Sequence, residues 1–509
     1  AGELSKRAIE TAQITFRKLK SSFIKLAAKD SAKQDIVFVM DKSGSIGSSN
    51  FVLEKKFVEN LIEYFPIFPT KTRVAVITYS TTVKLEFNFN KYINKECLRK
   101  GIQGIRYTGG TTATGSALQF VKNNLLFNSA AGARTDATKV IYVLTDGKSN
   151  VGVKPGIPAG QLKQRRVVIF AMGVTSSIRE SELLEIATSK DHVFHVKDYE
   201  ALDEVTQLLQ GDLSGKCRNG QTVFDACGRR CKCQAGRLVQ CCRLRKEFTD
   251  MTFEERVRYI NTVKTASSVL PFKTSYESLL TLHRIQFNTP IHRRDFFLPW
   301  HRWFIIEYEN LLRKIDCRVT VPYWDWSLVG ASPFTSNFWN TGASGFGGNG
   351  KPPGGCVNTG PFRAGQFSLV ASAGGGCLTR NFKGRAPDAV AVAILLTITP
   401  ANFFQFEAAL RGPFHDDIHC IIDGTMCTID AASAPEFFLH HGFVDKIWSD
   451  WQKMSNAHQF NTFFQNHPSI MTSTPYRPRE LLDLSNQPGC ICAEYVDPKS
   501  SVYRAVKGL

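Results

Sequence analysis

Four histidines in the C-terminal half of the chain restrict how this half can fold. His415 and His419 are four residues apart, so on a helix both imidazoles project from one face and can bind one metal ion. A third ring must come from another segment, and His440 and His441 supply it from the apolar stretch 437–443. Two adjacent histidines in such a stretch are hard to explain by packing alone, so we expect these segments to meet at a metal site.

A second set of three histidines lies upstream, at His283, His292 and His301. No cysteine or carboxylate accompanies either set at a matching spacing. Neutral imidazoles without thiolates favour a pair of copper ions over a closed structural zinc site, and they tolerate both oxidation states of copper. The sequence therefore predicts a dicopper centre.

Five blocks of sequence in the C-terminal half resemble the type-3 copper proteins, the family of tyrosinases, catechol oxidases and molluscan-type haemocyanins. The blocks are Leu-His-Arg at 282–284, Phe-Leu-Pro-Trp-His-Arg at 297–302, Val-Pro-Tyr-Trp-Asp-Trp at 321–326, the pair His415 and His419, and Phe-Leu-His-His at 438–441 followed by Val-Asp-Lys-Ile-Trp at 444–448. A motif of this kind is informative because several blocks occur in order. The resemblance also suggests a molluscan-type matrix or byssal tyrosinase-like protein.

The resemblance implies a mainly α-helical bundle over residues 243–509 and assigns the ligands. One copper ion is expected at His283, His292 and His301, and the other at His415, His419 and His441. For His440 it implies a supporting role. The two ions would use O₂ to oxidise a phenol or catechol to an ortho-quinone.

Some residues depart from the family pattern. Arg411 occupies the region where an acidic residue often holds an active-site water, and Glu407 is the alternative for that role. Asp416 follows His415 where asparagine is common in tyrosinases, and Phe443 replaces a usual asparagine near the copper. These differences favour catechol oxidation over monophenol hydroxylation.

The N-terminal part predicts a doubly wound α/β domain. Its β-branched, apolar runs are 35–40, 73–77, 140–144 and 166–170. Strands that are apolar on both faces are typical of a mostly parallel sheet covered by helices, whose ligands bind beyond the carboxyl ends of the strands. The side chains expected at those ends are Asp41, Ser43, Ser45, Thr112 and Asp146, an oxygen-only set that suits Mg²⁺ with one open position.

These segments resemble a von Willebrand factor A domain, over residues 33–212, with its metal-ion-dependent adhesion site. The resemblance implies that the five residues bind Mg²⁺, or Mn²⁺ or Ca²⁺, and that the open position accepts a carboxylate of a partner protein. Thr111 is the alternative to Thr112. The competing interpretation is that these are ordinary turn residues, or a remnant in a scaffold domain.

Residues 1–32 predict a basic amphipathic helix, formed by residues 4–28. Phe16, Leu19, Phe23 and Leu26 repeat at helical spacing, and the opposite side carries Arg17, Lys18, Lys20 and Lys25. This helix either packs on the domain that follows or binds a polyanion or partner.

Residues 213–242 predict a small cysteine-rich linker module. The chain has fourteen cysteines, and six of them are Cys217, Cys227, Cys231, Cys233, Cys241 and Cys242. Such a cluster indicates disulfides formed in an oxidising compartment, with the pairing left open. A zinc knuckle is the alternative.

Three local expectations concern the copper domain. Thr252 and Glu255 form the pattern of a capping box. Glu309 and Arg313 are expected to support a helix from its exposed face. The glycine-rich stretch 332–384 is expected to be a lid or binding loop.

The composition of the chain limits the partners and the cellular location that we expect for it. The net charge is +18, which favours acidic matrix components, and no nucleic-acid-binding motif is present. The longest apolar run, 389–398, is too short to span a membrane. We therefore expect a secreted phenol or catechol oxidase that cross-links extracellular matrix proteins through tyrosine or dopa and docks on a collagen-like or acidic matrix component. The alternatives are haemocyanin-like O₂ binding and a catalytically silent structural protein.

Overall fold

A computed structural model describes residues 6–28, 32–214, 217–352 and 355–508 of the 509-residue chain. The chain divides into two compact units. Unit 1 contains residues 1–223 and 232–239, and unit 2 contains residues 224–231 and 240–509. Each is described by itself.

Unit 1 is built on a six-stranded sheet in the order β3-β2-β1-β4-β5-β6. The strands are β1 (Gln34–Asp41), β2 (Thr72–Tyr79), β3 (Val83–Phe87), β4 (Thr138–Thr145), β5 (Val168–Val174) and β6 (Val193–Val196). All neighbouring strands are parallel except β3, which is antiparallel to β2. Both faces of β1 are buried, as its unbroken apolar run predicts. The predicted α/β class is confirmed.

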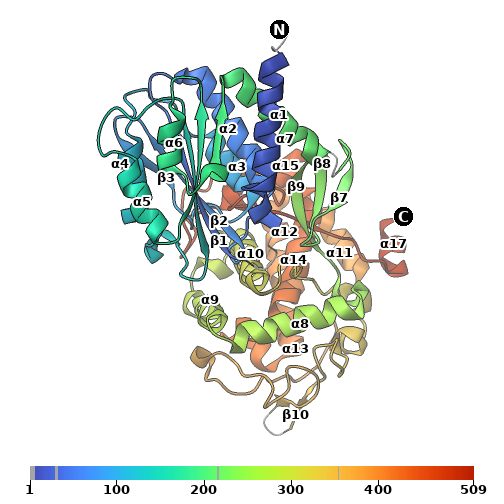
Figure 1. The fold of residues 1–509 in the computed structure, drawn as a ribbon. Helices are drawn as coiled ribbons and strands as arrows, with labels where there is room; N and C mark the ends of the chain where they lie inside the picture. Colours follow the sequence, from blue (N-terminus) through green and yellow to red (C-terminus); the bar gives the residue numbers. More distant parts are fainter. Residues whose placement is uncertain (1–5, 29–31, 215–216, 353–354, 509) are drawn as a thin grey trace. The chain divides into compact units, whose positions relative to one another are not determined.

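Helices cover both faces of this sheet (Figure 1). They are α1 (Lys6–Ser21), α2 (Gly47–Ile62), α3 (Lys95–Gln103), α4 (Thr114–Asn124), α5 (Gly156–Gln164), α6 (Glu180–Ile186) and α7 (Tyr199–Ser214). One core joins α1, α2, α3 and α7 to alternate strand residues such as Phe38, and the other joins α4, α5 and α6 to the intervening residues such as Val39.

The N-terminal helix is shorter than predicted, because α1 ends at Ser21 and a 3₁₀ turn follows over Ile24–Ala28. Residues 1–5 and 29–31 of the predicted 1–32 segment lie outside the described residues. Phe23 packs in the core against Phe38 and Tyr142. The Nζ of Lys18 donates to the carbonyls of Lys190 and Val193. These contacts favour the interpretation in which this segment packs on its own domain.

The cysteine-rich stretch contributes β7 (Thr222–Phe224), β8 (Arg230–Gln234) and β9 (Arg237–Arg245) to a small sheet that also contains β12 (Cys492–Tyr495). Its disulfides are Cys217–Cys233, Cys231–Cys241, Cys227–Cys317 and Cys242–Cys492. Two of the bonds are local, whereas the other two connect the stretch to distant parts of unit 2. The described residues contain no free cysteine, so the zinc-knuckle alternative is wrong.

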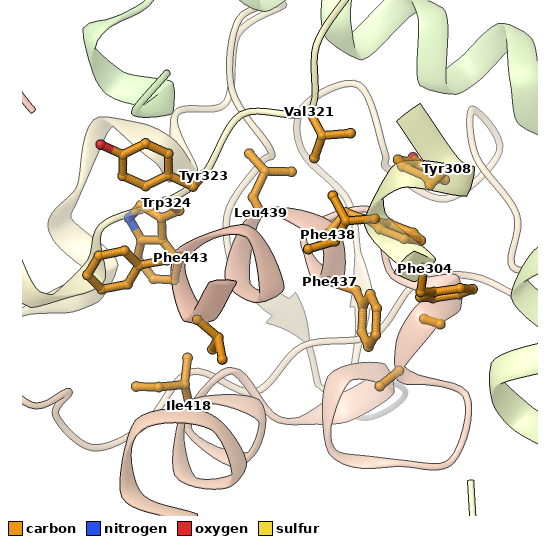
Figure 2. Packing of buried hydrophobic residues seen from close by; sticks show 14 of the residues in the cluster. Phe304, Tyr308, Val321, Tyr323, Trp324, Ile418, Phe437, Phe438, Leu439 and Phe443 are labelled. Atoms are coloured by element: carbon orange, nitrogen blue, oxygen red, sulfur yellow. The ribbon is translucent and has the colours of Figure 1, made fainter. Parts of the chain in front are cut away.

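Unit 2 is mainly helical. Its helices are α8 (Phe253–Ser268), α9 (Phe272–Gln286), α10 (Phe297–Ile315), α11 (Ala389–Leu396), α12 (Phe403–Arg411), α13 (Asp417–Ile422), α14 (Phe437–Gln452), α15 (Asn456–Gln459), α16 (Thr462–Gln465) and α17 (Ser501–Lys507). Helix α14 is buried along nearly all its length. Figure 2 shows Phe437 and Phe438 of α14 near Phe304 and Tyr308 of α10, and Phe443 beside Tyr323 and Trp324.

Two local expectations have different outcomes. The capping box is confirmed, because the Thr252 hydroxyl accepts from the Glu255 amide and the Glu255 carboxylate accepts from the Thr252 amide. The prediction that Glu309 and Arg313 form an exposed pair is wrong, since both side chains are buried. Arg243 and Arg245 donate to the Glu309 carboxylate instead.

The described part of the glycine-rich stretch 332–384 is largely irregular. It contains the two-residue strands β10 (Gly350–Lys351) and β11 (Cys356–Val357) and three short 3₁₀ turns. It is nevertheless packed in the described part: Phe338, Phe346 and Phe362 belong to the core of unit 2. Cys356 and Cys377 are bonded to each other. Among the described residues no single helix is long and apolar enough to cross a membrane, although α11 together with the segment 400–422, bent by 106°, passes the same test of length and composition.

Candidate metal centres

Five segments of unit 2 bring the predicted copper ligands together. His283 lies near the end of α9, His292 ends a 3₁₀ turn at Pro290–His292, and His301 lies in the first turns of α10. His415 and His419 follow one another across a π-helical turn at Gly412–Asp416 and α13. The pair His440 and His441 lies in α14.

The rings of His415, His419 and His441 converge on one point. The Nε2 atoms are 3.1 Å apart for His419 and His415, and 3.2 Å from each of these to His441. The Nδ1 of His419 donates to the Met426 carbonyl, and the Nδ1 of His415 contacts the Asp416 carboxylate at 2.8 Å. Since these contacts keep the protons of His415 and His419 on Nδ1, the Nε2 atoms of these two rings present lone pairs to each other. Buried lone pairs at this distance repel unless a cation lies between them.

His440 also has a ring nitrogen within 4.8 Å of those of His415 and His419. However, both of its nitrogens have other partners. The Trp326 indole, which can only donate, is 3.3 Å from His440 Nδ1, so the proton of His440 is on Nε2 and is donated to the His415 carbonyl. This leaves no lone pair for a metal, so the hydrogen bonds favour His441 as the ligand.

The second set consists of His283, His292 and His301, which each have a ring nitrogen within 4.8 Å of the others. His292 Nδ1 and His301 Nδ1 donate to the carbonyls of Phe287 and Phe297, which points Nε2 inward. His301 Nε2 and both ring nitrogens of His283 are buried without a hydrogen-bond partner. A metal ion would satisfy these buried nitrogens, which otherwise carry a desolvation cost.

The two sets face each other. The rings of His301 and His441 are stacked with centroids 4.6 Å apart, and His292 lies 6.5 Å from His415. Phe437 contacts both sets, at 5.0 Å from His283 and 4.1 Å from His441. This geometry would allow one small molecule to contact metal ions in both sets.

Burial favours the neutral form of five of the candidate ligands, which is the form that binds a metal. It lowers the pKa of His283, His301, His419 and His441 well below the usual value, and that of His292 to about 4. His292 is the only half-buried member of the six. The other five candidate ligands are buried.

The three-imidazole sets fit copper, because neutral nitrogen donors suit this metal and each set leaves an open face. A third group of candidate ligands, Asp225, Cys231 and Cys241, does not fit a metal, since the two cysteines form a disulfide.

Two residues discussed above as differences from the family pattern, Glu407 and Phe443, have clear contacts in the structure. The Glu407 carboxylate is fully buried and bonded by the Arg411 guanidinium at 2.7 and 3.4 Å. Phe443 was expected near the copper, but it stacks on Tyr323 and meets Trp326 edge-on. No ring contact of Phe443 with a candidate ligand is found in the described part of the chain.

In unit 1, the loops after β1 and β4 meet. The Ser43 amide donates to Asp41 Oδ1 at 2.8 Å, the hydroxyls of Ser43 and Ser45 are 3.1 Å apart, and Ser45 donates to Asp146 Oδ1 at 3.0 Å. Thr112 is buried with its amide bonded to Asn150. The Thr111 hydroxyl is exposed and bonded to Thr81.

The carboxylates of Asp41 and Asp146 lie together at this place. Burial raises the pKa of Asp41 to about 6, with Asp146 adding to the effect, and burial also raises the pKa of Asp146. Glu54 of α2 is fully buried and one of its oxygens accepts from Tyr199. Oxygen donors with excess negative charge fit a divalent cation.

Sequence reasoning placed Phe437 in the apolar stretch beside the ligands without giving it a separate role, and it did not identify Glu54. Both residues lie in helical segments with many apolar residues, and only their contacts with other helices distinguish them from ordinary core residues. The four remaining histidines have other partners. His192 and His195 bond within unit 1 to Ser189 and the Thr175 carbonyl, His458 bonds to Ser455, and His467 contacts Asp295 at 3.2 Å.

Comparisons with known proteins match both units. A family model described as the von Willebrand factor type A domain matches residues 35–208, and the common central domain of tyrosinase matches residues 273–454. A tyrosinase of Streptomyces lincolnensis is 30% identical over 230 residues, which are 41% of this chain and 82% of that protein.

The collagen alpha-1(XXI) chain of Xenopus laevis is 39% identical over 184 residues, which are 36% of this chain and 19% of the collagen. The chain thus spans only about a fifth of this relative. A solved structure, proximal thread matrix protein 1 from the mussel byssus, is 32% identical, with a TM-score of 0.34, over 35% of this chain and 47% of that chain.

Proposed function

The chain belongs to the tyrosinase family and carries a von Willebrand factor type A domain ahead of its tyrosinase domain, and from this we propose that it oxidises phenols in an extracellular matrix. The reaction is copper-dependent conversion of a phenol or catechol to an ortho-quinone by O₂. The observation that carries this proposal is the convergence of three Nε2 atoms within 3.2 Å of one another, facing a second set of three histidines.

We assign one copper ion to His283, His292 and His301 and the other to His415, His419 and His441. A copper pair held by these residues would supply the electron transfer between phenol and O₂. The chain supplies rigid ligands: carbonyl acceptors at Phe287, Phe297 and Met426 fix the ring orientations.

The surrounding side chains position the substrate and exclude water. Phe437 and Phe297 are fully buried against the imidazoles, so they keep the inner side of the centre dry. His292 is half-buried, which makes its side the proposed entry for a flat ring, and the charges of Asp416 and Arg411 act on His292 there.

We infer that catechols are better substrates than monophenols. Hydroxylating a monophenol requires a group that takes up the phenol proton. The carboxylate expected to hold an active-site water, Glu407, is engaged in an ion pair with the Arg411 guanidinium instead.

The A domain is proposed to hold the enzyme on its substrate. Asp41, Ser43, Ser45, Thr112 and Asp146 would bind Mg²⁺ or another divalent ion, and a carboxylate of a matrix protein would complete its coordination. The similarity to the A domain of a collagen supports a matrix location. Cross-linking of tyrosine or dopa side chains through quinones is the proposed outcome, and the excess of basic residues would help retain the protein on acidic components.

The test is turnover of a monophenol and a diphenol side by side, with copper determined on the same sample. We expect two copper ions per chain and faster turnover of 4-tert-butylcatechol than of the matching monophenol. Two copper ions without turnover would favour O₂ binding instead. Absence of copper after loading would favour a structural protein.

A further inference from the structure

The thirteen tyrosines of the chain all lie in its described part, and none of them is exposed. Eight are buried: Tyr79, Tyr142, Tyr199, Tyr259, Tyr276, Tyr308, Tyr323 and Tyr495. Tyr308 and Tyr323 lie inside the packing of unit 2 (Figure 2). The five others, Tyr64, Tyr92, Tyr107, Tyr476 and Tyr503, are half-buried.

Four phenylalanines, in contrast, are exposed at the described surface. Phe224 and Phe253 are each 61% exposed, Phe404 is 49% exposed and Phe127 is 37% exposed. A hydroxyl makes tyrosine the less costly aromatic residue in contact with water, so tyrosine would be expected at such positions. Exposed aromatic positions in this chain carry a ring without a phenol.

The half-buried tyrosines are held in place. The hydroxyls of Tyr64 and Tyr107 donate to Asp212 and to the Ser43 carbonyl, and that of Tyr503 bonds to Asp497. The Tyr92 ring meets Phe87 at 4.8 Å, and Tyr476 packs on the core of unit 2. A phenol held in this way cannot extend into the metal centre of another molecule.

Free thiols, like exposed tyrosines, are absent from the described surface. Thiols are strong nucleophiles toward quinones, and the described residues contain no free cysteine. The surface therefore lacks both the group from which this enzyme would make a quinone and the group that would trap one fastest.

We propose that the enzyme acts only on tyrosine or dopa side chains of a separate polypeptide and that its surface spares its own tyrosines and sulfur atoms from the reaction. This inference rests on the proposed function. Each tyrosine oxidised takes one O₂: one oxygen atom enters the ring, the other leaves as water, and the phenol becomes an ortho-quinone. The partner must present its tyrosine on a segment that can reach the half-buried side of the centre at His292.

The test uses the copper-loaded full chain in air, alone and with a short tyrosine peptide. Mass spectrometry reports oxygen gain at every native tyrosine, and a denaturing gel reports covalent oligomers. Catechol turnover is measured on the same sample. We expect catechol turnover and oxidation of the peptide, with no oxygen gain at the thirteen native tyrosines and no oligomers.

Three variants supply the controls. A C-terminal Gly-Gly-Tyr extension gives the chain an accessible phenol, and a Gly-Gly-Phe extension is its matched control. Phe253→Tyr places a phenol at a 61% exposed position with little change in shape. We expect tyrosine oxidation and covalent oligomers with the Gly-Gly-Tyr extension and neither with the Gly-Gly-Phe extension. In the Phe253→Tyr variant, we expect more oxygen gain at residue 253 than at any native tyrosine.

Oxygen gain at native tyrosines of the wild-type chain, at a rate like that of the extension, would overturn the inference. A second outcome would also overturn it: no oxidation of the tyrosine extension or of the tyrosine peptide in a sample that turns over catechol. In that case the enzyme would not oxidise accessible tyrosines, and burial of the native tyrosines would protect them from nothing. Absence of catechol turnover is a different failure, since it would contradict the proposed function itself.

Discussion

His440 and His441 are neighbours in the chain, yet their ring nitrogens have different partners. His440 accepts from Trp326 and donates to the His415 carbonyl, whereas His441 directs Nε2 at two other imidazoles. Sequence spacing alone cannot separate two adjacent histidines. The separation depends on a tryptophan more than a hundred residues away in the chain.

The first prediction compares His440→Gln with His441→Gln. Glutamine keeps a donor and an acceptor at position 440, so we expect that variant to retain two copper ions per chain and to lose up to about 2 kcal/mol of stability. The variant at position 441 should retain about one copper ion. Metal analysis and thermal unfolding measure both effects. Loss of copper from the first variant only would assign the ligand role to His440.

Glu309 shows why a helical i, i+4 pattern can mislead. Glu309 and Arg313 match a solvent-exposed pair, but Glu309 is fully buried between Arg243 and Arg245 and also accepts from the Val321 amide. Burial alone would raise the pKa of Glu309, but the two arginines outweigh it and lower the pKa to about 2.

The second prediction concerns acid stability. Because the pKa of Glu309 is lower in the folded state, its stabilising effect is complete above about pH 4.5 and is lost as the pH falls towards 2, by about 3 kcal/mol in all. Glu309→Gln should lower the melting temperature near neutral pH, and the difference from wild type should shrink below pH 4. A constant difference between pH 7 and pH 3 would contradict this account.

Among the elements, long apolar runs were predictable and short edge strands were not. β1, β2 and β4 are continuous hydrophobic runs and contain the predicted runs, whereas β5 is Val168–Val174 and is shifted toward the C-terminus from the predicted run 166–170. β3 (Val83–Phe87) is an edge strand with exposed positions, and β6 is only four residues long, so neither has a strong pattern of its own. The six candidate copper ligands were predictable because histidine is rare, whereas the aromatic residues that enclose them look like ordinary core.

The disulfides explain how the cysteine-rich stretch differs from a self-contained module. Cys242 in β9 and Cys492 in β12 are 250 residues apart and are bonded where these two strands pair. Closing such a long loop restricts the unfolded chain more than closing a short one. This bond therefore anchors the chain end to the start of unit 2.

The third prediction compares two double serine variants. Replacing Cys242 and Cys492 should lower the free energy of unfolding of unit 2 by about 5 kcal/mol, and replacing Cys356 and Cys377, which close a 21-residue separation, by about 3 kcal/mol. Denaturant unfolding measures both. Equal losses would mean that loop length does not control the stabilisation.

At the scale of the whole molecule, the chain combines a family of oxidases with a domain known from matrix proteins. Each unit has its own core and its own candidate metal site. The sequence predicted this division from two unrelated sets of motifs. The docking partner could not be predicted, since a carboxylate that completes a cation's coordination occurs in many proteins.

The fourth prediction is that matrix retention depends on a divalent cation. Copper-loaded protein should bind immobilised collagen in Mg²⁺ at moderate salt, and EDTA should release it. Asp41→Ala should reduce retention at least tenfold, because it removes a buried carboxylate from the cation site. Lys84→Ala, an exposed charge change in the same unit, is the control. Retention that resists EDTA and falls only with salt would indicate binding through the basic surface alone.

Anomalous diffraction at the copper absorption edge, from crystals of the copper-loaded chain, tests the central claim most directly. We predict two copper peaks in unit 2, one within bonding distance of His283, His292 and His301 and the other of His415, His419 and His441. A single peak, a peak bound by His440 in place of His441, or no peak among these six side chains would contradict the account.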